Sequence, residues 1–219
     1  MTYVTFSNDT VIFGQRTIRI SNGIDFSSIP LRQQIHTMEN ELHLIGVAEI
    51  HFWHGFDRII NGLKEYYTQN PTYKVYFHIV GNLSGERERQ EIEMPIHTYG
   101  LSPYVILHGA KHGKELDVLF EKADFAVGSL ARHRSGIQNI KTLKNREYAA
   151  RGFGFIYSET DDDFEKMPYI LKAPADETPI EISKVIAFCK KQTTPPQEIR
   201  DSIRNLSWKE QMKKVYDSI

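Results

Sequence analysis

Apolar residues recur along this chain with two different periods, and segments of the two kinds alternate. One helical face is formed by apolar residues at i, i+3, i+4, i+7, i+10 and i+11: Phe56, Ile59, Ile60, Leu63, Tyr66 and Tyr67. Apolar runs of strand length occupy residues 41–48, 74–80, 104–108, 123–127 and 153–157. Segments of helical composition lie between them, at residues 55–70, 86–99, 114–122 and 143–151. This alternation with short connections predicts an α/β fold with a doubly wound parallel sheet.

Glycines lie near the carboxyl ends of four predicted strands: Gly46, Gly81, Gly109 and Gly128. Ligands of doubly wound sheets bind beyond these ends. A missing Cβ lets the backbone approach a ligand, so Gly81 with Asn82 and Gly109 with Ala110 are candidate binding positions. A turn requirement alone is the alternative explanation for any single glycine.

A basic loop connects the strand at 123–127 to the helix at 143–151, and it includes Arg132, His133, Arg134, Ser135 and Gly136. Loop amides and the positive end of a following helix together favour an anion. Lys144 and Glu147 are three residues apart and share a helix face, so a cation and a carboxylate can line one pocket. This arrangement suits a nucleoside diphosphate, with Lys144 on phosphate oxygens and Glu147 on ribose hydroxyls. A surface ion pair of Glu147 with Arg146, Arg151 or Lys144 is the alternative.

The run LKNREYAARG at residues 143–152, followed by an apolar strand, resembles the donor-sugar signature of GT-B glycosyltransferases of the family 4 type. Members commonly carry Leu-Lys-x-x-Glu-Tyr-x-Ala-x-Gly at this point. The resemblance implies a Rossmann-like sheet that forms the C-terminal half of a GT-B fold. It also implies that Glu147 holds the ribose of a nucleotide sugar, and that loop amides from Ser135 to Leu143 face the diphosphate.

The two ends of the chain resemble the same family. The run ISNGID at residues 20–25 is similar to the linker between the two halves, and Ser207 with Glu210 forms a capping box that opens a last helix at 207–218. We therefore expect three parts. Residues 1–24 are the remnant of the N-terminal half and the linker, residues 25–205 are the donor-binding domain, and residues 206–219 pack back toward the N-terminal half. That acceptor-binding half is an expected partner that this chain lacks, through truncation or by nature.

Three positions depart from the family pattern. Asn139 stands eight residues before Glu147, where many relatives have a second Glu, and an amide carries no charge. In the loop after the first strand, Glu49 and His54 stand where relatives present an Arg and a Lys to the diphosphate. We expect Arg58, one turn after His54, to replace part of the lost charge.

The amino-acid composition further narrows the classes of protein to which this chain can belong. A chain of 219 residues with 40% hydrophobic residues can bury one substantial core. The formal net charge of −1 predicts no nucleic-acid partner, and no apolar run reaches the ~18 residues of an integral membrane segment. The single cysteine, Cys189, fits a reducing compartment. We expect a cytoplasmic protein, free or peripheral to the inner membrane surface. Because the nine histidines match no ligand framework, we expect no metal and no cofactor.

These features predict the donor-binding domain of a glycosyltransferase (a hexosyltransferase) in polysaccharide biosynthesis. The substrate is a UDP- or GDP-sugar, and the acceptor is a hydroxyl of a glycan or a lipid-linked glycan. The resemblance implies retention of configuration and assigns catalysis to Lys144 and Glu147, with leaving-group charge stabilised by amides and cations. Two alternatives stay open. One is a non-catalytic nucleotide-sugar-binding module, which Asn139 and Glu49 favour, and the other is a GT-B-like epimerase or phosphorylase.

Overall fold

Six parallel strands form the central sheet of the computed structural model, which describes residues 2–33, 35 and 39–218. The spatial order is β6-β5-β4-β7-β8-β9, and every pair is parallel. The chain runs outward from β4 through β5 to β6 and then crosses back to β7, so the topological switch point lies between β4 and β7. The strands are β4 (Glu41–Val47), β5 (Lys74–Val80), β6 (Val105–Leu107), β7 (Phe125–Val127), β8 (Phe155–Tyr157) and β9 (Ile170–Lys172). The predicted doubly wound parallel sheet is confirmed.

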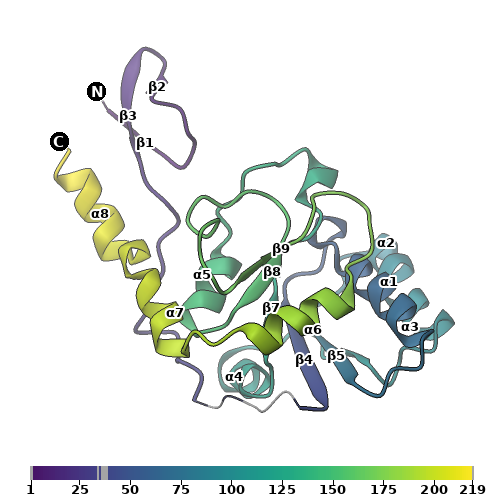
Figure 1. Ribbon diagram of the computed structural model, residues 1–219. Helices are drawn as coiled ribbons and strands as arrows, with labels where there is room; N and C mark the ends of the chain where they lie inside the picture. The colour runs from purple at the N-terminus through teal and green to yellow at the C-terminus, as the bar shows by residue number, and fades with distance from the viewer. Residues whose placement is uncertain (1, 34, 36–38, 219) are drawn as a thin grey trace.

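Helices cover both faces of this sheet (Figure 1). One core contains Ile59 of α1 (Phe56–Tyr67), Ile96 of α3 (Met94–Thr98) and Val185 of α6 (Ile182–Lys191). The other core contains residues of α4 (Gly113–Glu121), α5 (Leu143–Ala150) and α7 (Pro196–Ser202). The helix predicted at 86–99 is one continuous helical segment with a π-helical turn, made of α2 (Glu86–Glu88), η2 (Arg89–Glu93) and α3.

A small second sheet lies at the N-terminal end. Its strands are β1 (Tyr3–Thr5), β2 (Val11–Ile12) and β3 (Gln15–Arg19), and β1 pairs in parallel with β3. This sheet and α8 (Trp208–Tyr216) project from the same side of the main body, where both chain ends lie (Figure 1). Half of the predicted capping box of α8 is present: the Ser207 hydroxyl accepts from the Glu210 N–H at 3.2 Å, whereas the Ser207 N–H donates to the Arg204 carbonyl at 3.1 Å. The domain boundaries at residues 24 and 205 stay predictions.

The linker is fixed to α8 through buried contacts. The Ser21 N–H donates to Oε1 of Gln211 at 2.7 Å. Gly23 lies so close to Trp208 that a Cβ there would be 2.4 Å from the indole ring. In the ranges that the structure describes, no helix combines the length and the apolar character that crossing a membrane requires.

Candidate functional site

The loops that follow β4 and β7 lie against each other at the switch point. The Leu130 N–H, after β7, donates to the carbonyl of His54, after β4, at 2.9 Å. Gly55 has a positive φ of 67°, and a Cβ there would lie 2.8 Å from Cβ of Ala131. The contact therefore requires glycine. It places η1 (Phe52–His54) beside η3 (Arg132–Ser135), which brings His54 close to Arg132.

Three basic side chains converge there: His54, Arg132 and Lys144 of α5. We refer to these three side chains, as a group, as the basic crevice. The Lys144 ammonium is enclosed without a hydrogen-bond partner, 5.5 Å from the centre of the Phe56 ring. Nε of Arg132 and the hydroxyl of Ser129 are also buried without a partner. Buried polar groups are normally satisfied, and a buried cation without an anion is costly. The crevice thus offers several unused donors at the point where doubly wound sheets bind ligands.

Crowding of these groups changes their protonation. Burial, with the nearby Arg132, lowers the pKa of Lys144 to about 7. Burial, reinforced by Lys144, Arg132 and His51, lowers the pKa of His54 to about 2, so its imidazole is neutral at physiological pH. Since the His51 N–H donates to Nδ1 of His54 at 3.0 Å, the proton of His54 is on Nε2. His54 is therefore a neutral N–H donor, and the charge of the crevice comes from Arg132 and protonated Lys144.

A separate cavity of about 320 Å³ lies at the carboxyl ends of β4, β5 and β6. Gly81 donates through its N–H to the Gly109 carbonyl at 2.8 Å, and Asn82 Oδ1 accepts from the Ala110 N–H at 3.2 Å. The structure thus brings together the two predicted pairs of strand-end residues. A Cβ on Gly81 would lie 1.6 Å from the Ala48 carbonyl oxygen, so this glycine is required by packing between two loops.

Glu147 is on α5 and is linked to α4 through Arg151. Its Oε1 accepts from Nε of Arg151 at 2.9 Å, and Arg151 also binds Asp117 of α4 at 2.7 Å. The side chain keeps 33% of its surface exposed. The adjacent Arg146 fixes the helix, because its buried guanidinium pairs with Asp161 at 2.6 Å and with Asp163. The carboxylate of Glu147 is therefore held at a set position, with Oε2 free of hydrogen bonds to the described residues.

Arg58 does not join the basic crevice. It is 1% exposed, and each of its three guanidinium nitrogens donates to a protein acceptor: the Thr178 carbonyl at 2.8 Å, Asp176 at 3.2 Å and the Leu130 carbonyl. These hydrogen bonds connect the loop between β9 and α6 with the loop that follows β7. The expectation that Arg58 replaces a phosphate-binding cation therefore needs correction.

The other two basic residues of the 132–136 loop are also engaged. His133 lies between two carboxylates, Glu159 at 3.3 Å and Glu177 at 2.8 Å. Arg134 forms a two-pronged pair with Asp57 at 2.9 and 2.7 Å and a second pair with Glu177. These bonds hold the loop in place, whereas the Arg132 guanidinium lies 5.6 Å from the centre of the Trp53 ring and close enough to Lys144 to lower its pKa.

Four further predicted positions lie on the surface or in another cavity. Asn139 lines a cavity of about 280 Å³ next to the N-terminal sheet and forms a β-bridge with Thr160. Ser135, Gly136 and Leu143 are exposed. Their donor-binding roles stay predictions. Ser129 was not predicted, since a lone serine after a strand carries no sequence signal.

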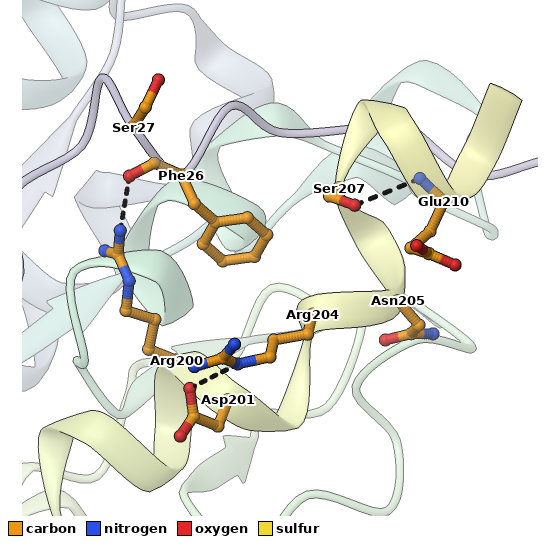
Figure 2. A pocket seen from close by; sticks show the side chains of 8 residues that line it. All are labelled: Phe26, Ser27, Arg200, Asp201, Arg204, Asn205, Ser207 and Glu210. Atoms are coloured by element: carbon orange, nitrogen blue, oxygen red, sulfur yellow. Dashed lines mark hydrogen bonds and ion pairs between the residues drawn. The ribbon is translucent and has the colours of Figure 1, made fainter. Parts of the chain in front are cut away.

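A cavity of about 750 Å³ lies between the linker and the C-terminal helices. Figure 2 shows its two arginines turned to protein acceptors: Arg200 to the Phe26 carbonyl and Arg204 to Asp201, at 2.7 Å. Since both arginines are paired, this cavity offers no free cation. Among the described residues, no group of three or more His, Cys, Asp or Glu side chains is arranged so that it could hold a metal ion.

No protein-family model and no curated protein matches this sequence. Solved structures do match. A glycosyltransferase from Rickettsia africae has 13% identity and a TM-score of 0.71, over 94% of this chain and 57% of its own. The lipopolysaccharide outer core galactosyltransferase WaaB has 14% identity and a TM-score of 0.64, over 95% of this chain and 57% of its own. Anabaena HepE in complex with UDP and glucose has 15% identity and a TM-score of 0.66, over 94% of this chain and 57% of its own.

The chain therefore spans a little more than half the length of these enzymes. The Rossmann-like sheet and the fold implied by the LKNREYAARG run are both confirmed by the structural neighbours. This chain has the fold of the C-terminal domain of GT-B glycosyltransferases.

Proposed function

We propose that this chain is the donor-binding domain of a glycosyltransferase that uses a nucleoside diphosphate sugar. The observation that carries this proposal is the enclosed, unpartnered Lys144 ammonium beside Arg132 and His54 at the switch point. A diphosphate is an anion of suitable charge for this crevice, because it supplies acceptor oxygens to all three donors. The neighbours solved with UDP and with UDP-glucose support the same class of ligand.

The crevice acts on the leaving group. When the bond between the anomeric carbon and the diphosphate oxygen breaks, negative charge grows on the diphosphate. Fixed donors in a site with little water stabilise that charge more than solvent does. Arg132 and protonated Lys144 supply the charge, and Nε2–H of His54 supplies a neutral hydrogen bond. Glu147 accepts hydrogen bonds from the ribose hydroxyls and thereby fixes the position of the nucleotide sugar in the site.

The remaining features are proposed from the family resemblance. They are a UDP or GDP donor, a glycan or lipid-linked acceptor hydroxyl, and retention of the anomeric configuration. The partner is an acceptor-binding half.

The experiment is thermal unfolding with UDP, GDP and their sugar derivatives. At ~100 times the dissociation constant, a ligand adds roughly 2.7 kcal/mol, or about 5–10 °C for a domain of this size. Lys144→Met removes the ammonium, and Lys141→Met, whose lysine pairs with Asp163 at 3.6 Å, is the matched control. We expect a shift with one base that Lys144→Met removes and Lys141→Met keeps. No shift with any nucleotide at millimolar concentration contradicts the proposal.

A second candidate is a binding module without catalysis. The position of Asn139, which lines a different cavity next to the N-terminal sheet, favours it. Hydrolysis of the bound donor separates the two functions. A transferase domain joined to an acceptor-binding half releases nucleoside diphosphate, whereas a binding module leaves the donor intact.

A further inference from the structure

Strands β4 and β7 separate at their carboxyl ends. They pair only at Leu44 with Phe125 and at Ile45 with Ala126. Beyond this point β4 continues to Val47, which stays paired with β5, and β7 continues to Val127, which stays paired with β8. The sheet is therefore split at the switch point, next to the basic crevice.

The side chain of Tyr148 fills the split. Its hydroxyl accepts from the Val47 N–H at 3.0 Å and donates to the Val127 carbonyl at 3.1 Å. The side chain is 1% exposed, and its ring packs against the rings of Phe120 and Phe155. Backbone groups buried in a dry interior need a partner, and one hydroxyl here satisfies a donor on β4 and an acceptor on β7. The hydroxyl therefore replaces the backbone hydrogen bond that is missing between β4 and β7 at this position.

Tyr148 also belongs to the helix that carries the site. Lys144 is four residues earlier on α5, one turn away on the same face. Glu147 is the adjacent residue. A bond from Tyr148 to both strands fixes the depth and rotation of α5 against the strand ends. The positions of the Lys144 ammonium and the Glu147 carboxylate follow from that.

We propose that Tyr148 is a positioning residue whose hydroxyl bridges the ends of β4 and β7 and thereby sets the position of Lys144 in the basic crevice. It does not touch the ligand. The role of the crevice in nucleotide binding rests on the proposed function, but the placement of Lys144 by Tyr148 does not. The two ideas can therefore fail separately.

The test compares Tyr148→Phe with Tyr157→Phe. Both tyrosines are fully buried in the same core, and the Tyr157 hydroxyl is also bonded, to Glu165 at 2.9 Å. The first readout is the titration of Lys144 in the free protein, followed by NMR on lysines labelled at Cε and assigned with Lys144→Met. In Tyr148→Phe the Val47 N–H and the Val127 carbonyl lose their partner and admit water. We therefore expect the pKa of Lys144 to rise by at least one unit, with no change in Tyr157→Phe.

The second readout is the affinity for UDP by calorimetry. Tyr148→Phe should weaken binding about tenfold, while Tyr157→Phe stays within twofold of the wild type. If the wild type binds no nucleoside diphosphate, the proposed function fails, and the Lys144 titration still decides the role of Tyr148. An unchanged Lys144 titration in Tyr148→Phe overturns the inference.

A third measurement needs no variant, in case Tyr148→Phe does not fold. Hydrogen exchange of the Val47 amide in the wild type reports the bond to Tyr148 directly. We expect protection similar to that of the Ile45 amide in the paired part of β4. Exchange of Val47 as fast as in an exposed loop overturns the inference.

Discussion

Glu147 and Arg151 form an ion pair across one turn of α5, with 2.9 Å between Oε1 and Nε. The pair leaves Oε2 of Glu147 without a hydrogen bond to the described residues and fixes its direction. A carboxylate held in this way accepts two ribose hydroxyls without first losing side-chain freedom. The same contact that looks like an ordinary surface pair in the sequence thus prepares Glu147 for a ligand.

Substitution of Glu147 should remove the contribution of the ribose hydroxyls. Hydrogen bonds to a charged acceptor contribute roughly 1.5–3 kcal/mol, so Glu147→Ala should weaken UDP binding about 10- to 100-fold. The check is calorimetry with UDP and with 2′,3′-dideoxy-UDP. The wild type should prefer UDP, and Glu147→Ala should bind both alike. Glu198→Ala, on the exposed surface of α7, is the control. If Glu147→Ala keeps the wild-type preference for UDP, the assigned role is wrong.

Substitution of Lys144 should stabilise the free protein. The pKa of Lys144 lies at about 7 in the folded state, below its ordinary value of 10.5, so the unfolded chain binds more protons between these pH values. Wild-type stability should therefore rise as the pH increases through this window. At pH 7 and below, the buried charge of Lys144 lowers the free energy of unfolding of the wild type by roughly 3–5 kcal/mol. Lys144→Met lacks this charge and should melt at a higher temperature than the wild type. The measurement is urea unfolding at pH 6.5 and pH 9.5, with Lys141→Met as control. A lower stability of Lys144→Met at pH 6.5 contradicts this prediction.

The affinity for a nucleoside diphosphate should fall with rising pH. Above pH 7 the free protein loses the proton of Lys144, and binding must restore it. The dissociation constant of UDP should increase up to tenfold per pH unit between pH 7.5 and pH 9, where the phosphates of UDP are fully ionised. Titrations in Lys144→Met should show weak binding that does not change over this range. A flat wild-type profile would exclude Lys144 as the phosphate-binding cation.

The three histidines on β4, β5 and the end of β6 should cause acid instability. His78 lies between His43 and His108, with 2.9 Å between ring nitrogens on each side. Burial, with the neighbouring His43, His108 and Lys122, lowers the pKa of His78 to about 4. Since the unfolded chain gains this proton near pH 6.5, folded stability should decrease as the pH falls from 6.5 to 4.

His78→Gln tests this directly. The variant should show a smaller loss of stability between pH 6.5 and pH 4.5, measured by urea unfolding monitored with circular dichroism. His97→Gln, at an exposed position of α3, should lose as much stability as the wild type. Equal losses in His78→Gln and the wild type would show that other groups govern acid unfolding.

Periodicity in the sequence predicted the sheet well because burial determines it. The α1 residues Ile59, Ile60 and Leu63 are fully buried, as their helical spacing indicates. Strand β9 was missed, because it is a three-residue edge strand without a fully buried position. The LKNREYAARG run indicated the fold, since it places a helix with Lys144 and Glu147 at the end of a buried strand.

The composition of the crevice depended on contacts between distant segments. Arg58 looked free in the sequence, but Thr178 and Asp176, more than 100 residues later, fold onto its guanidinium. Among the basic loop residues, only the structure distinguishes Arg132 from Arg134, which binds Asp57 and Glu177. Local pattern reports which face of an element is buried. The local pattern does not indicate which basic side chain forms an ion pair with a carboxylate in the folded chain.

A calorimetric series tests whether the basic crevice binds a diphosphate. Uridine, UMP and UDP are titrated into the wild type and into Lys144→Met at pH 7. Binding of the diphosphate by Lys144 predicts that the second phosphate increases wild-type affinity at least tenfold and that Lys144→Met loses this gain while binding uridine as before. Equal affinities of UMP and UDP in the wild type, or a full gain in Lys144→Met, would contradict it.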